Sequence, residues 1–157
     1  MTISNSCLLL AVGPYHIKYL EKTLDNIPDV IKKVFIINDT GKILPKRIYQ
    51  IKDPRFLIFE NKDNIGLSKS LYKWQNNCFE YDYIFRLDVG DISSIDRYQK
   101  QINYMEKNKN CVLCSIRSKL KSSQGNYKYS YKNYGNLISK IILMITNPII
   151  HGSICIR

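Results

Sequence analysis

The stretch "YIFRLDVGDISSIDRYQKQI" (Tyr83–Ile102) decides the expected fold, because an apolar run, two carboxylates and a helical pattern follow one another in it. The apolar run predicts a buried strand over Tyr83–Asp88, and the later pattern predicts a helix over Ser93–Asn108 that begins with a serine cap. Asp88 and Asp91 therefore come after the strand and before the helix. Two acids at the tip of a buried strand indicate a binding site.

The same alternation of apolar runs and helical patterns extends over the first two-thirds of the chain. Apolar residues at helical spacing predict further helices over His16–Ile27 and Gly66–Phe79. This alternation favours an α/β fold, with a mostly parallel sheet flanked by helices. Such sheets bind ligands beyond the carboxyl ends of their strands, where Asp39 and Asp88 are both expected. The other predicted strands are Cys7–Val12, Lys33–Asp39, Arg55–Asn61, Cys111–Ile116 and His151–Arg157.

The pattern changes after Leu120, which divides the chain into an α/β domain (residues 1–120) and a short irregular C-terminal region (121–157). Residues 121–136 are polar, rich in tyrosine and interrupted by glycine, and predict a hairpin or a mobile loop. The apolar segment Leu137–Ile150 is too short and too polar to span a bilayer. Its exposure would favour a homodimer.

The N-terminus and the cysteines predict a cytoplasmic protein. The opening "MTISNSCLLLAV" lacks the basic region and the long apolar run of a signal peptide. Five cysteines without a regular framework predict reduced thiols. Cys111 and Cys114 lack the second pair of ligands that a structural zinc site needs.

The basic charge is concentrated in the last third of the chain. The net charge is +11, and no acidic residue follows Glu106. Such a block attracts an anionic partner, which could be nucleic acid, an acidic membrane leaflet or a phosphorylated substrate, unless it is simply a solvated face. The nine basic residues after Glu106 are Lys107, Lys109, Arg117, Lys119, Lys121, Lys128, Lys132, Lys140 and Arg157.

The strand-end acids have a definite chemistry. Paired carboxylates suit Mg²⁺ or Mn²⁺, which proteins usually share with substrate phosphates, and Asp88 and Asp91 are therefore candidate ligands. A metal held in this way neutralises a departing diphosphate. Asp39 is suited to accept hydrogen bonds from an uncharged part of a nucleotide. The alternative for Asp88 is an acid that only caps a turn.

Five blocks of this sequence resemble, in order, the nucleotide-binding half of family 2 glycosyltransferases with the GT-A fold. The resemblance covers essentially the whole chain. It is strongest to bacterial enzymes that build lipopolysaccharide, capsule and exopolysaccharide. The fourth block, which resembles Arg-Met-Asp-Ala-Asp-Asp-Ile, is the most specific. The blocks are "LLLAV…YLEKTLDNI" (8–27), "VFIINDTG" (34–41), "ENKDNIGLSKSLYKW" (60–74), "YIFRLDVGDISSIDRYQKQINYME" (83–106) and "NPIIHGSICIR" (147–157).

The resemblance implies a role for several residues. Ala11 corresponds to the point where the first strand meets the nucleotide base, and Asp39 to the acid that binds uracil or its equivalent. Lys69 corresponds to a position near the diphosphate. Asp88 matches the first acid of the Asp-x-Asp motif, near the ribose and a Mn²⁺ or Mg²⁺ ion, with Asp91 as the second metal ligand.

The departures from the family pattern concern the metal and the catalytic base. Gly90 occupies the position of the second acid of Asp-x-Asp, so metal binding either moves to Asp91 or is weak. The family's Glu-Asp base region has no counterpart in this sequence. His151 is the remaining titratable candidate for a base in the tail.

These features lead to three alternative functions. The first is a glycosyltransferase domain that moves a sugar, with inversion, from a nucleotide-sugar donor to a saccharide or lipid-linked acceptor. For it we expect peripheral association of Arg117–Ile150 with the anionic inner membrane face. The second is a truncated, non-catalytic remnant that keeps the nucleotide site. The third, which the acids at the sheet edge disfavour, is a nucleic-acid binder that uses "YKYSYKNY" (Tyr127–Tyr134).

Overall fold

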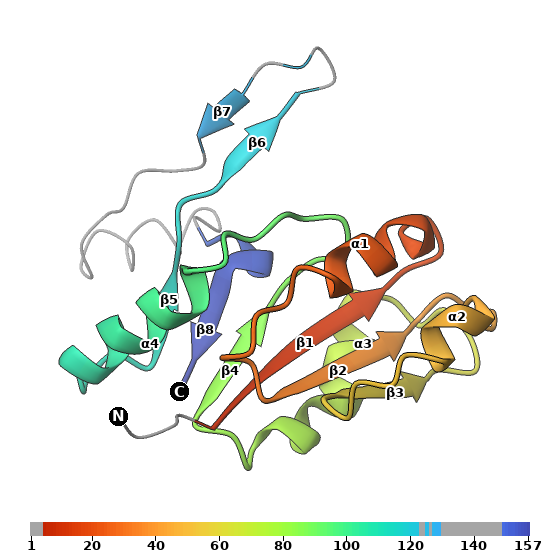
Figure 1. Cartoon of the computed structure of the whole chain (residues 1–157), viewed down its shortest axis with the longest axis horizontal. Helices are drawn as coiled ribbons and strands as arrows, with labels where there is room; N and C mark the ends of the chain where they lie inside the picture. The colour runs from red at the N-terminus through yellow and green to blue at the C-terminus, as the bar shows by residue number, and fades with distance from the viewer. Residues whose placement is uncertain (1–4, 123–124, 126, 130–148) are drawn as a thin grey trace.

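A mixed sheet organises the protein, and the computed structural model describes it over residues 5–122, 125, 127–129 and 149–157. Within these residues six strands follow the order β3-β2-β1-β4-β8-β5 (Figure 1). β1, β2, β3 and β4 are parallel, while β8 runs antiparallel to both β4 and β5. The strands are β1 (Ser6–Val12), β2 (Lys33–Asn38), β3 (Phe56–Glu60), β4 (Tyr83–Arg86), β5 (Leu113–Ser115) and β8 (Ile154–Ile156).

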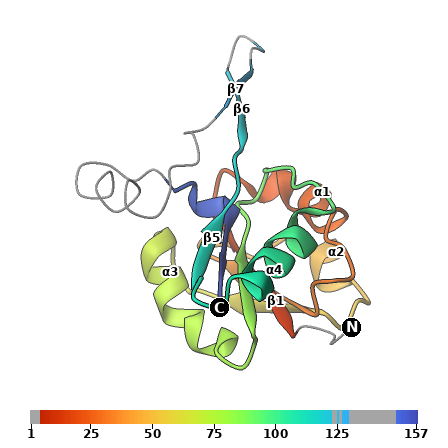
Figure 2. The same cartoon turned by 90° about the vertical axis from the view of Figure 1, so that its left-hand side faces the viewer.

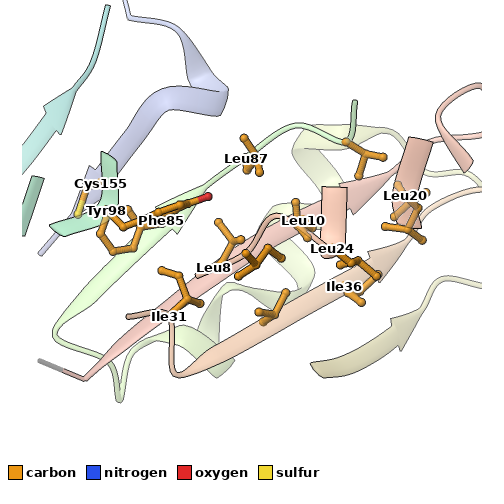
Figure 3. Close-up of a cluster of buried hydrophobic side chains, with 14 of the residues drawn as sticks. Leu8, Leu10, Leu20, Leu24, Ile31, Ile36, Phe85, Leu87, Tyr98 and Cys155 are labelled. Atoms are coloured by element: carbon orange, nitrogen blue, oxygen red, sulfur yellow. The ribbon is translucent and has the colours of Figure 1, made fainter. Parts of the chain in front are cut away.

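Helices cover both faces of the sheet, as Figure 2 shows, with α3 on one side and α1, α2 and α4 on the other. The alternating side chains of β1 explain this arrangement, because both faces of a central parallel strand are buried. Leu8 and Leu10 pack towards α1 and α4 (Figure 3), whereas Cys7 and Leu9 pack towards α3 and η2. The helices are η1 (Ile17–Tyr19), α1 (Leu20–Leu24), α2 (Lys46–Tyr49), α3 (Leu67–Trp74), η2 (Gln75–Cys78), α4 (Arg97–Lys107) and η3 (His151–Ser153).

The sheet confirms the predicted α/β architecture, but the helix bounds were wrong at several points. The helix expected over His16–Ile27 is a 3-10 turn followed by the five residues of α1. The helix expected from Ser93 begins at Arg97, with Asp96 at the N-cap position, so the serine cap was wrong. Exposed Ile92 and Ile95 precede α4 and do not extend its buried face. The four-residue helix α2 was not predicted.

The C-terminal region contributes to the sheet. The strand expected over Cys111–Ile116 is the shorter β5, and β8 lies between it and β4. The predicted hairpin is present as β6 (Lys119–Lys121) and β7 (Tyr127–Tyr129), which stand clear of the sheet in both views (Figures 1 and 2). The apolar segment 137–148 lies outside the described residues. Among the helices of the described part of the chain, none has the length and apolarity required to cross a bilayer.

Candidate functional site

A cavity of about 360 Å³ opens at the carboxyl ends of β1, β2 and β4. Parallel strands direct the residues that follow them to this edge of the sheet. Acids meet the cavity from two strands, Asp39 after β2 and Asp88 after β4. The cavity is lined by Ala11, Gly13, His16, Asp39, Asn64, Leu67, Asp88 and Val89.

Asp39 is held rigidly at one end of the cavity. It is buried, and its Oδ1 accepts hydrogen bonds from Asn61 Nδ2 (3.0 Å) and from the backbone N–H of Ile65 (2.9 Å). Asn64 Nδ2 donates to the backbone carbonyl of Asp39 (2.6 Å). Among the described residues Oδ2 of Asp39 has no hydrogen-bond donor, so it can accept one from a ligand.

Asn61 is the centre of the network behind Asp39, and the sequence analysis did not identify it. Its Nδ2 donates to Asp39 and to Ser70 Oγ (2.8 Å), while its Oδ1 accepts from Lys73 Nζ (2.9 Å) and Trp74 Nε1 (3.1 Å). Asn61 follows β3 directly, just as Asp39 follows β2, and this strand-end position was the available signal. The network ties α3 to the carboxylate of Asp39.

We expect Asn61→Ala to lower the free energy of unfolding by about 2 kcal/mol, because it leaves several buried polar groups without partners. Chemical denaturation measures this change. Asn77→Ala is the matched control, since the exposed Asn77 donates one hydrogen bond to Trp74 O (3.0 Å). Equal stability of the two variants would contradict the role given to Asn61.

Asp88 and Asp91 bring two carboxylate oxygens to one point. A Cβ atom added to Gly152 would lie 2.8 Å from Asp88 Oδ2 and 3.1 Å from Asp91 Oδ2, so both oxygens face this glycine. The backbone N–H of Asp91 donates to Asp88 O (3.0 Å), which closes the turn between them. Gly90 adopts a φ of 102° within that turn, a conformation that favours glycine.

Two buried arginines, Arg86 and Arg97, bond to Asp88 and to the backbone around it. Arg86 Nη2 donates to Asp88 Oδ1 (2.6 Å), which leaves Oδ2 of Asp88 directed at Gly152. Arg97, which the sequence analysis missed, donates to the backbone carbonyls of Arg86 (2.8 Å), Gly152 (3.0 Å) and Ile154 (3.3 Å). Arg97 thereby fixes η3 against the end of β4.

Electrostatics distinguishes the acids of this site from ordinary surface carboxylates. The residue Asp91 is exposed as a whole, but its carboxylate lies against Gly152. The partial burial of this carboxylate raises the pKa of Asp91, and the neighbouring Asp88 carboxylate raises it further. Burial lowers the pKa of Arg86, and Asp88 opposes that change. A cation placed between the carboxylates would relieve their repulsion.

His151 lies beside the same arginine. Its Nδ1 is 3.3 Å from Arg86 Nη2, and because a guanidinium group can only donate, Nδ1 accepts this hydrogen bond. Burial lowers the pKa of His151, and the positive charge of Arg86 adds to the effect. The imidazole is therefore neutral with its proton on Nε2.

Most of the binding residues predicted from the sequence lie at or next to the cavity, but Lys69 does not. Ala11, Asp39 and Asp88 line the cavity, and Asp91 lies next to Asp88. Lys69 is exposed on α3 and is not among the residues that line the cavity. Lys73, one helical turn further on, is the lysine of α3 that bonds to the network behind Asp39.

Two acids, Asp88 and Asp91, are available to hold the Mg²⁺ or Mn²⁺ ion predicted from the sequence. Among the described residues no group of three or more His, Cys, Asp or Glu side chains is arranged to hold a metal ion. Mg²⁺ and Mn²⁺ nevertheless bind commonly through one or two carboxylates, with waters and substrate phosphates completing the shell. The converging Oδ2 atoms of Asp88 and Asp91 fit that requirement.

A model of glycosyl transferase family 2 matches residues 16–157 of this chain. The chain belongs to this family. An uncharacterized glycosyltransferase of Methanocaldococcus jannaschii is 35% identical over 103 residues, covering 61% of this chain and 35% of that protein. An uncharacterized glycosyltransferase of Haemophilus influenzae is 29% identical over 79 residues, covering 50% of this chain and 26% of that protein.

Solved structures agree with this assignment at the level of the fold. The crystal structure of S. aureus TarS 1–349 has a TM-score of 0.70 at 14% sequence identity and covers 98% of this chain. The GT-A fold expected of a family 2 glycosyltransferase is thereby confirmed. This chain spans 47% of the TarS structure and about a third or less of the two curated glycosyltransferases.

Proposed function

We propose that this family 2 glycosyltransferase binds a nucleotide-diphosphate sugar in the cavity and transfers the sugar, with inversion, to a saccharide or lipid-linked acceptor in cell-surface polysaccharide synthesis. The observation that carries the proposal is the presence of two kinds of acid at one edge of the sheet, with Asp39 and Asp88 lining the cavity and Asp91 next to Asp88. Within the described part of the chain, Oδ1 of Asp39 is held by a buried network and Oδ2 has no hydrogen-bond donor. Asp88 and Asp91 present two converging oxygens.

Each end of the cavity suits one part of the donor. Asp39 Oδ2 would accept an N–H or O–H of the base or ribose, which fits an uncharged group and repels phosphate. Asp88 and Asp91 would hold Mg²⁺ or Mn²⁺ against the diphosphate. When bound, such an ion neutralises charge on the leaving diphosphate. Phosphate without a cation would be repelled by the same carboxylates.

The surroundings of His151 argue against its use as the catalytic base. A base must accept a proton from the acceptor hydroxyl. Nδ1 of His151 already accepts from Arg86, and Nε2 carries the proton of the neutral ring. His151 is better suited to donate a hydrogen bond from Nε2 to a phosphate or sugar oxygen of the donor.

Calorimetric titration with UDP in the presence and absence of Mn²⁺ tests the donor site directly. We expect UDP binding that depends on Mn²⁺, and transfer to an added acceptor tests the reaction separately. Absence of heat with any nucleoside diphosphate would refute the proposal. Binding without transfer would leave the nucleotide site standing and identify the chain as non-catalytic by itself.

We expect Mn²⁺-dependent UDP binding to weaken as the pH falls, starting above the pH range in which an ordinary aspartate takes up a proton. The pKa of Asp91 is raised, so this carboxyl takes up a proton at a higher pH than usual and loses its affinity for a cation. Titration calorimetry across this range measures the change. Asp91→Asn should weaken binding and flatten its pH dependence, and an unchanged pH profile in that variant would contradict the assignment.

The β6–β7 hairpin suits an anionic membrane surface, where a lipid-linked acceptor would reside. The exposed Tyr127 lies opposite Lys121 in the register of the hairpin. The exposed basic residues on or beside the hairpin are Arg117, Lys119, Lys121 and Lys128. Aromatic rings and basic side chains together favour the membrane interface. Nucleic-acid binding and homodimer formation stay predictions from the sequence.

We expect Lys121→Gln to reduce binding to vesicles containing anionic lipid by about fivefold, because one lysine near such a surface contributes about 1 kcal/mol. Vesicle flotation at low and high salt measures this. Lys52→Gln, which removes an exposed lysine from the loop before β3 at the opposite edge of the sheet, is the control. Equal binding to neutral and anionic vesicles would argue against a membrane role for the hairpin.

A further inference from the structure

Two cysteines face each other across the β5–β8 ladder, outside the donor site. Cys114 and Cys155 are direct register partners in this antiparallel pair. Residues opposite each other in antiparallel strands have Cα atoms about 4.5–5.5 Å apart. Disulfides form over Cα separations of about 4.4–6.8 Å, so the Cα separation expected at this ladder position lies within the range for a disulfide.

The two thiols differ in access to solvent and in charge. Cys155 is fully buried, whereas Cys114 is partly exposed. Gln101 Nε2 donates a hydrogen bond to the Cys114 sulfur (3.6 Å), the Cys155 thiol lies opposite it in the ladder, and the Arg97 guanidinium adds positive charge nearby. The contact with Cys155 is the largest cause that lowers the pKa of Cys114, and the same contact, with burial, raises the pKa of Cys155.

This asymmetry assigns the order of reaction within the pair. A thiolate is the nucleophile in disulfide exchange, and access decides which thiol meets a reagent first. Cys114 has both properties. Cys155 is protected but lies beside the sulfur that Cys114 would present after reaction, so it can act as the resolving thiol.

We propose that Cys114 and Cys155 form a reactive thiol pair that low-molecular-weight disulfides convert into a cross-strand disulfide. The Cys114 thiolate attacks one sulfur of the reagent, a mixed disulfide forms, and one reagent thiolate leaves. The sulfur of Cys155 then attacks Cys114 and loses its proton to water or to the departing thiolate, and the second reagent thiolate leaves. Two electrons pass from the protein to the reagent, which ends as two thiols.

The other cysteines provide an internal comparison. Cys7 and Cys78 also lie together, but both are fully buried, and the contact with Cys78, together with burial, raises the pKa of Cys7. Cys111 precedes β5, and its Sγ donates to the carbonyl of Leu113 (3.3 Å). Burial raises the pKa of Cys111 as well. Cys114 is the cysteine that combines access with a stabilised thiolate.

The test is incubation of the whole folded chain with oxidised glutathione, followed by intact mass and peptide mapping. We expect a mass decrease of two hydrogen atoms and a cross-linked peptide joining Cys114 to Cys155. Cys155→Ser should instead retain one glutathione on Cys114. Cys111→Ser is the matched control and should react like the unchanged protein.

Several outcomes would overturn the proposal. They are a stable adduct on Cys111, a cross-link between Cys111 and Cys114, and no reaction at all in the folded chain. Should Cys155→Ser fail to fold, Cys155→Ala takes its place, and the peptide map of the unchanged protein is decisive without either. These readouts are independent of sugar transfer and of nucleotide binding.

Discussion

Replacing Asp88 with asparagine is expected to weaken Mn²⁺-dependent UDP binding by about 100-fold or more. Removal of a group that merely supports a metal ligand commonly costs about 10–100-fold, and a proposed ligand should cost at least the upper value. Asp88 also neutralises Arg86, whose side chain is 4% exposed, so the variant leaves a buried cation without its carboxylate. Calorimetric titration measures the affinity, and a thermal melt shows how much stability is lost.

Asp96→Asn is the matched control for Asp88→Asn. Asp96 comes shortly after Asp88 in the chain and also pairs with a cation, Lys100, but this ion pair is exposed and lies on α4. Such pairs contribute little to stability. The control should bind UDP normally, and a comparable loss in both variants would mean that net charge, rather than the site, governs binding.

We expect Gly152→Ala to reduce the same affinity by about 10- to 100-fold, the range for a change that displaces a metal ligand without removing it. The new methyl group would lie 2.8 Å from Asp88 Oδ2 and 3.1 Å from Asp91 Oδ2, closer than carbon and oxygen normally approach. The backbone at Gly152 is not in the left-handed region, so alanine meets this steric conflict without backbone strain. Calorimetric titration with UDP and Mn²⁺ measures the loss.

A double-mutant cycle separates this steric effect from general damage. If the methyl group acts by displacing the carboxylates, its effect should shrink in an Asp91→Asn background, because contacting residues are not additive. Strict additivity of Gly152→Ala and Asp91→Asn would indicate an unrelated disturbance. Full UDP affinity in Gly152→Ala would show that the converging oxygens are not used.

The parallel half of the sheet and its acids were predictable from sequence. β1, β2 and β4 are continuous apolar runs because both of their faces are buried, and such runs are the plainest signal that a strand gives. Once those strands were identified, Asp39 and Asp88 followed as strand-end residues at one edge. Both residues line a single cavity in the structure, and their role in binding stays a prediction.

The remaining parts of the site depend on contacts between distant segments. Arg97 bonds to Ile154 across 57 positions of sequence, and Gly152 meets Asp88 and Asp91 because β8 inserts beside β4. No pattern of neighbouring residues in the sequence predicts either contact. Local patterns misplaced the start of α4 for a related reason: Ile95 continues the apolar spacing, but the chain enters the helix at Arg97.

The insertion of β8 between β4 and β5 has a consequence for synthesis on the ribosome. β8 (residues 154–156) pairs with both β4 and β5, so these two strands cannot join one sheet until β8 has left the exit tunnel. β1 to β4 emerge long before that point. Pairings between distant segments also form more slowly than local ones. A nascent chain therefore places Asp39 at the edge of the cavity before Gly152 joins Asp88 and Asp91, so a chain arrested before Gly152 would lack the contact between η3 and the two carboxylates.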